Sequence, residues 1–157
     1  VISQIFRKDH QFLVHEMCVI GMSAFGDLLI YQKDFGLIDV VFAQHWISSK
    51  EFSGAIGDEI DARIRTAIFT GVEEPDNYDE AGKPLFERCL ARLGNLKPGQ
   101  IYTPILPPAA GGSLDLENYK IAEATAAISL NAQWAPFTLM DFSGPAGPKM
   151  IRIVGAG

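Results

Sequence analysis

Three side chains near the start of the chain, His10, His15 and Cys18, are of the types that bind metal ions. Zinc sites use such ligands at short, regular spacings and usually bind the ion through four of them. Here the spacing matches no established zinc pattern, and a fourth ligand would have to come from Asp9 or Glu16. We therefore favour three unrelated side chains over a metal site, and we expect neither a metal nor a cofactor.

Catalysis by a nucleophile would need a serine or cysteine beside a histidine and a carboxylate. The chain has 3 histidines and 19 carboxylates but no GxSxG elbow. Gly111 and Gly112, followed by Ser113, resemble half of a phosphate-binding turn, because free N–H groups at a helix start attract anions. Without GxGxxG or a following lysine, a tight loop with a helix cap is favoured. We expect no catalytic residues and a protein that is not an enzyme.

Negative charge is concentrated in one polar segment. Residues 73–80 contain five carboxylates and no basic residue. Like charges at this density repel one another unless solvent or a partner relieves them. Two interpretations stay open, a solvated loop and a binding surface for a basic partner. The residues of the second interpretation are Glu73, Glu74, Asp76, Tyr78, Asp79 and Glu80.

Length and composition indicate one domain over residues 1–157, with 48% hydrophobic and 20% charged residues. The net charge of −6 argues against a nucleic-acid partner, since no Lys/Arg cluster offsets it. No run reaches the roughly 18 apolar residues of a membrane helix, and charges interrupt any signal-peptide core in Val1–His15. Cys18 and Cys89 fit no CxxC pattern and lie in apolar stretches, so we expect buried free thiols in the cytoplasm.

Apolar runs over residues 18–20, 27–31 and 37–42 predict strands. The breaks between them are short, and a parallel crossover needs a dozen or more residues, so the strands should form an antiparallel meander. A proline–glycine turn at 97–100 leads into 101–106, where prolines exclude a central strand. We expect an extended edge or an irregular loop there.

Helical periodicity follows the meander. Apolar residues four apart predict an amphipathic helix over 52–69, and weaker patterns predict helices over 84–93 and 116–131, with Ser113 or Asp115 as cap of the last. A late strand is expected near 150–154. The sequence therefore predicts an α+β fold in which an antiparallel sheet packs against about three helices. The second helix should bury Phe86, Cys89, Leu90 and Leu93.

Three glycine-containing blocks occur in a characteristic order: 20–28, then 92–102 after Leu85-Phe86, then Gly111-Gly112 followed by 116–118. Together they resemble the C-terminal domain of the GAD-like immunity proteins that bacteria pair with type VI secretion DNase effectors. One departure is Thr103-Pro104-Ile105-Leu106, where the family has a Gly-Phe-Val-Pro-like continuation. The family-like region covers about residues 15–135, which leaves 136–157 as a C-terminal extension.

The resemblance implies a non-catalytic protein that binds and neutralises a cognate nuclease toxin in the cytoplasm. The acidic segment 73–80 would then meet the basic substrate groove of the nuclease. Two alternatives remain: a small-ligand or enzymatic domain with its pocket at loop 102–113, near His45, Trp46 or Tyr102, and a structural module of a larger protein. The family-motif residues, for which a structural role is expected, are Phe25, Gly26, Asp27, Leu93, Gly94, Tyr102, Gly111 and Gly112.

Overall fold

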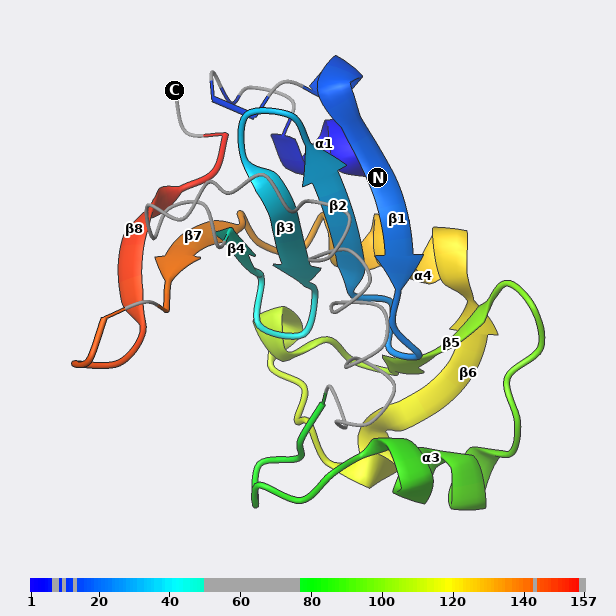
Figure 1. Ribbon diagram of the computed structural model, residues 1–157. Coiled ribbons are helices and arrows are strands. Elements are labelled where there is room, and N and C mark those ends of the chain that lie inside the picture. Colours follow the sequence, from blue (N-terminus) through cyan, green and yellow to red (C-terminus); the bar gives the residue numbers. More distant parts are fainter. Residues whose placement is uncertain (7–8, 10, 13, 50–76, 143, 156–157) are drawn as a thin grey trace.

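The structure is a computed structural model, and it shows two sheets with short helices around them (Figure 1). The predicted helix over 52–69 and the carboxylates Glu73, Glu74 and Asp76 lie outside the described part of the chain. Among the helices of the described part, none is long and apolar enough to cross a membrane. The described residues are 1–6, 9, 11–12, 14–49, 77–142 and 144–155.

The larger sheet has six strands in the order β1-β2-β3-β4-β7-β8. Strands β1 to β3 pair antiparallel in succession, so the predicted three-strand meander is confirmed, and β4, which was not predicted, continues it. The predicted late strand is β8, whereas β7 and its parallel pairing with β4 were not predicted. The strands are β1 (Met17–Met22), β2 (Leu28–Gln32), β3 (Gly36–Val41), β4 (Trp46–Ser49), β7 (Thr138–Asp141) and β8 (Lys149–Ile153).

A second, two-stranded sheet pairs β5 (Gln100–Pro104) with β6 (Tyr119–Glu123) antiparallel. The predicted helix over 116–131 is therefore wrong in its first half, which contains the strand β6. The second half is α-helical, as α4 (Ala124–Asn131). The sequence pattern favours a helix here, but as a strand these residues pair with β5 and bury Tyr119 in a hydrophobic cluster beside the small sheet. The Glu123 side chain accepts hydrogen bonds from two N–H groups of the first turn, so this residue caps α4 in place of the predicted Ser113 or Asp115.

The remaining described helices are short. The predicted helix over 84–93 is confirmed as α3 (Phe86–Leu93), and it begins two residues later than predicted. Phe86 is 39% exposed, which corrects its predicted burial; Leu85, just before the helix, is fully buried instead. The other helices are α1 (Ile2–Phe6) and the 3₁₀ turns η1 (Val14–Glu16), η3 (Pro108–Ala110) and η4 (Leu116–Asn118).

Two hydrophobic clusters form the core. The larger one joins the six-stranded sheet to α1 and α4, and the smaller one lies between the small sheet and α3. Neighbouring residues of β5 belong to different clusters, Ile101 to the larger and Tyr102 to the smaller, so this strand separates them. Both cysteines are free thiols. Cys89 is buried in the smaller cluster, and burial raises its pKa to about 11; Cys18 is exposed on the edge strand β1, which corrects its predicted burial.

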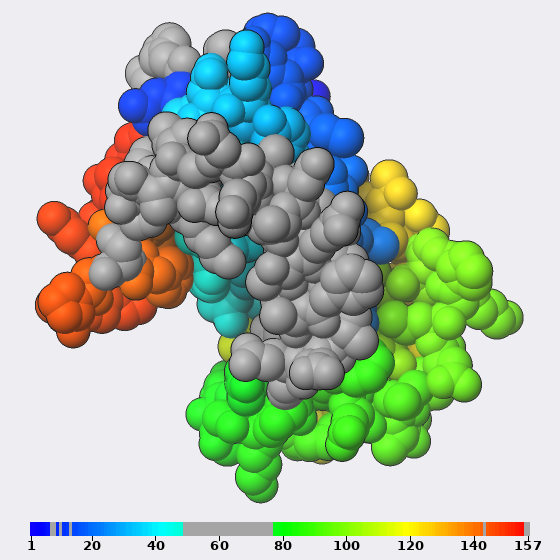
Figure 2. Space-filling view, in the orientation of Figure 1, coloured from blue at the N-terminus to red at the C-terminus, as the bar shows by residue number. Residues whose placement is uncertain are grey.

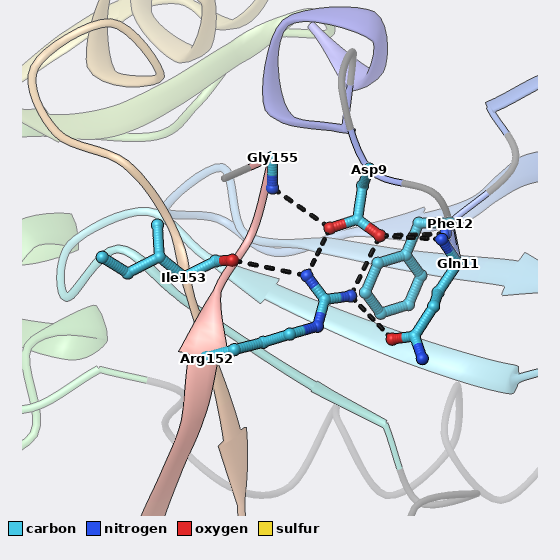
Figure 3. Close-up of polar contacts among 6 residues, drawn as sticks. All are labelled: Asp9, Gln11, Phe12, Arg152, Ile153 and Gly155. Carbon is cyan, nitrogen blue, oxygen red and sulfur yellow. Dashed lines mark hydrogen bonds and ion pairs between the residues drawn. The ribbon is translucent and has the colours of Figure 1, made fainter. Parts of the chain in front are cut away.

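An ion pair joins the two ends of the described chain (Figure 3). The Asp9 carboxylate pairs with the guanidinium group of Arg152 on β8 and also accepts hydrogen bonds from three backbone N–H groups. Burial alone would raise the pKa of Asp9, but Arg152 and these N–H groups outweigh it and lower the pKa to about 2. The backbone donors are those of Gln11 (3.0 Å), Phe12 (3.2 Å) and Gly155 (3.1 Å).

Candidate functional site

The first family-motif block forms a tight turn between β1 and β2. The Ser23 Oγ atom accepts hydrogen bonds from the N–H groups of Phe25 (3.2 Å) and Asp27 (3.1 Å). Gly26 has a φ angle of 87°, and a Cβ atom there would lie 2.7 Å from Cδ1 of Ile101. Glycine is required for both the backbone conformation and the close approach, so the turn packs directly against β5.

Asp27 ties this turn to two other parts of the chain. Its Oδ1 atom accepts a hydrogen bond from the N–H group of Phe42 (3.0 Å), at the end of β3. Its Oδ2 atom accepts one from the Asn77 side chain (3.0 Å), at the start of the segment that leads to α3. The motif aspartate thus connects the larger sheet to the neighbourhood of the smaller one.

Aromatic side chains fill the space between this turn and the small sheet. The Phe25 ring lies 5.8 Å from the Tyr102 ring and 5.7 Å from the Tyr119 ring, between centroids. The Tyr102 hydroxyl donates a hydrogen bond to the Gly94 carbonyl (2.7 Å), and Leu93 packs against the same cluster. Burial raises the pKa of Tyr102 and, more strongly, that of Tyr119, so both stay neutral. The contacts of these motif residues are with the protein's own interior.

The glycine pair of the third block lies in a loop whose peptide groups are already paired. The N–H group of Gly111 donates to the Pro108 carbonyl (2.9 Å), and that of Gly112 donates to the Pro107 carbonyl (3.0 Å). A Cβ atom at Gly112 would lie 1.8 Å from the Leu106 carbonyl oxygen. These N–H groups are therefore not available to an anion, which disfavours a phosphate-binding turn.

A cavity of about 10 Å³ borders this loop, which is the space of roughly one water molecule. The residues proposed for a pocket there do not line it. His45 is itself buried, with Nε2 2.8 Å from the Asn131 carbonyl oxygen and its ring 4.9 Å from the Phe137 ring. This cavity therefore gives the small-ligand alternative no support. Its lining consists of Phe25, Asp27, Phe42, Ala43, Asn77, Pro104, Pro107, Pro108, Tyr119 and Asn131.

The described end of the acidic segment is a small hairpin, which we call the 77–84 hairpin. It is closed by a bridge between Tyr78 and Pro84 and by a hydrogen bond from the Leu85 N–H group to the Asn77 carbonyl (2.9 Å). Its side chains alternate between interior and surface. Asn77 and Asp79 are only 3% and 8% exposed, whereas Tyr78 is 49% exposed and Glu80 is also exposed.

Asp79 shapes the hairpin from within. Its Oδ1 atom accepts hydrogen bonds from the N–H groups of Lys83 (2.8 Å) and Ala81 (3.0 Å), and its Oδ2 atom pairs with Arg88 of α3. The Lys83 N–H group and Arg88 together hold the pKa of Asp79 below its usual value. Of the predicted binding residues within the described part, Tyr78 and Glu80 therefore face solvent, and Asp79 does not.

The sequence did not predict the structural roles of two residues of this hairpin. Asn77 reaches Asp27, and Asp79 braces the turn. The signal that could have revealed the role of Asp79 is an aspartate followed by Gly82 and Pro84, which is typical of a turn closed by a side-chain carboxylate.

The described residues contain no group of three His, Cys, Asp or Glu side chains that could hold a metal ion.

Comparisons with known proteins place this arrangement in context. The family described as T6SS immunity protein Tdi1, C-terminal, matches residues 67–134, which include the 77–84 hairpin, α3, the small sheet and α4. No curated protein matches the chain. The crystal structure of Atu4351 from Agrobacterium tumefaciens is similar over 99% of this chain and 71% of that chain, with a TM-score of 0.89 and 30% sequence identity.

Proposed function

We propose that this chain, whose residues 67–134 match the family described as T6SS immunity protein Tdi1, C-terminal, binds a cognate effector toxin and neutralises it without catalysis. The observation that carries the proposal is the extent of the family match. The matched region holds the hairpin and the small sheet, whose Tyr102 and Tyr119 pack in one cluster with Phe25 of the turn between β1 and β2. In this chain the matched region is thus a scaffold that presents surface loops, as expected of a binding protein.

The effector in this proposal is a nuclease with a basic substrate groove, neutralised in the cytoplasm. Its support is the charge distribution. Residues 50–76 contain seven carboxylates and three basic residues, so most of the net charge of −6 belongs to them. Glu80 and Tyr78 continue this acidic segment with exposed side chains. Charge of opposite sign speeds association and orients the partners. Glu73, Glu74 and Asp76 enter the proposed surface by sequence alone.

The test measures binding to a catalytically inactive effector from the gene beside this one, at low and moderate salt. Glu74→Gln with Glu80→Gln should weaken binding about three- to tenfold at low salt and flatten its salt dependence. The matched control is Glu16→Gln with Asp34→Asn, which removes the same charge from exposed positions in η1 and in the turn between β2 and β3. Absence of binding by the wild-type protein would overturn the immunity role. Equal effects in both variants would overturn only the acidic site.

A further inference from the structure

Exposed apolar side chains lie on two adjoining segments, the 77–84 hairpin and the loop after β5. Tyr78 is 49% exposed, Ile105 57% and Leu106 44%. The two segments adjoin, because Asn77 and Pro107 line the same small cavity and the Glu80 carboxylate accepts a hydrogen bond from the Leu114 N–H group (3.4 Å). Single exposed apolar residues are ordinary, but neighbouring ones often mark binding sites. We call Tyr78, Ile105 and Leu106 the apolar patch.

The loop that carries Ile105 and Leu106 is fixed by Asn118 of η4. The Asn118 side chain donates hydrogen bonds to the carbonyls of Leu106 (2.7 Å) and Ser113 (2.7 Å), and its Oδ1 atom accepts one from the Leu106 N–H group (3.1 Å). The Asn118 carbonyl also accepts a hydrogen bond from the Ile105 N–H group (2.6 Å). The exposed side chains are therefore held by an ordered backbone, which lowers the entropy lost when a partner binds them.

Exposed acidic side chains around the apolar patch outnumber the basic groups that are free to meet a partner. Arg88 is engaged by Asp79, and Arg92 donates to the Leu116 carbonyl, so both guanidinium groups serve the protein itself. Glu80 and Glu117 have exposed side chains nearby, with Lys83 as the exposed basic residue of the hairpin. A partner with an apolar anchor framed by basic groups fits this surface better than an acidic or uniformly apolar one.

We propose that the apolar patch is the centre of the surface that binds the effector, with the acidic side chains at its rim. The inference rests on the proposed immunity function and names the residues that hold the partner in place. All three patch residues lie within the family match at 67–134. A second group of exposed apolar residues, Met150 and Ile151 on β8, lies outside that match. Strand β8, red in Figures 1 and 2, lies apart from the green segment that holds the 77–84 hairpin and α3.

The experiment compares two double variants in binding the inactive effector by biolayer interferometry. Ile105→Ser with Leu106→Ser should weaken binding about 10- to 100-fold, mainly through faster dissociation, because buried anchors carry most interface energy. Met150→Ser with Ile151→Ser removes equally exposed apolar side chains and should change affinity less than about threefold. Circular dichroism verifies that both variants fold, and Tyr78→Ala provides a patch variant outside the 105–106 loop.

The outcomes separate this proposal from the one on which it rests. If the wild-type protein binds the effector and the patch variants bind as well as it does, the patch assignment is wrong and the immunity role stands. If the wild-type protein binds no effector, the immunity role itself fails. If the patch variants instead convert a dimer to a monomer in sedimentation, with effector affinity unchanged, the occupant is a second copy of this chain and the proposal is overturned.

Discussion

Asp9 and Asp79 are both buried carboxylates paired with an arginine, but one connects distant parts of the chain and the other connects near neighbours. Their side chains are 2% and 5% exposed, and their partners Arg152 and Arg88 are 31% and 36% exposed. Each also accepts hydrogen bonds from backbone N–H groups. Asp9, however, joins residues 143 positions apart, whereas Asp79 joins residues 9 positions apart.

Because the two ion pairs differ in span, one should contribute to the stability of the fold and the other to the orientation of exposed side chains. The Asp9 pair fixes the N-terminal segment against β8, so its loss would release an edge of the larger sheet and one end of the chain. The Asp79 pair shapes a short turn, and Asp79 and Arg88 belong to neither hydrophobic cluster. Similar chemistry therefore stabilises the whole fold at one site and orients two exposed side chains, Tyr78 and Glu80, at the other.

Removal of the Asp9 carboxylate should have the largest effect. Asp9→Ala removes the ion-pair partner of Arg152 and leaves three N–H groups without their acceptor, so we expect a loss of about 2–4 kcal/mol in the free energy of unfolding. Urea denaturation measures it. Asp79→Ala should shift the midpoint less. Equal shifts in the two variants would contradict the distinction between the pairs.

The Asp9 contribution should also depend on pH. Its folded-state pKa of about 2 lies below the ordinary value of 3.8, so the stabilisation is present above pH 4 and is lost as the pH falls toward 2. The amount is about 1–2 kcal/mol after allowance for solvent screening. The measurement is the difference in unfolding free energy between wild type and Asp9→Asn from pH 6 to pH 2. A difference that stays constant on acidification would exclude this linkage.

Parts of the fold whose pattern is local could be predicted from the sequence. The meander, α3 and β8 follow from apolar runs and turn residues that lie next to one another. Residues 119–123 could not be predicted, because their alanine-rich continuation favours a helix and only pairing with β5 makes them a strand. The parallel contact between β4 and β7 also depends on segments about ninety positions apart.

The same distinction applies to the candidate site. The acidic segment and the exposure of Glu80 could be foreseen from charge, because isolated carboxylates are rarely buried. The burial of Asp79 could not, since it depends on Arg88 and on a turn that returns the chain to Lys83. The apolar patch was not predicted, because an extended edge or irregular loop over 101–106 does not say which of its apolar side chains face solvent, and the folded loop exposes Ile105 and Leu106.

The stabilisation by Asp9 and Asp79 combines ion pairing with hydrogen bonding. A buried polar side chain that has no ion pair isolates the contribution of hydrogen bonding. Gln32 at the end of β2 is fully buried, and its side-chain amide has no hydrogen-bond partner among the described residues. Gln32→Met should therefore stabilise the protein by about 1 kcal/mol in urea denaturation. Asn131→Leu is the contrast, because the Asn131 amide donates to Thr103 Oγ1 (3.3 Å), and it should destabilise. Destabilisation by both changes would show that packing, not hydrogen bonding, dominates at these positions.

The smallest effect on stability is expected at Asp79, where the change should be seen in effector binding instead. Asp79→Asn weakens its pairing with Arg88 and loosens the turn that presents Tyr78 and Glu80, so effector dissociation should be about three- to tenfold faster with little change in the urea midpoint. Glu87→Gln removes the same charge from the exposed face of α3 without touching the turn. Faster dissociation in Asp79→Asn alone would assign the effect to the shape of the hairpin, whereas equal changes in both variants would assign it to charge and remove the functional half of the comparison.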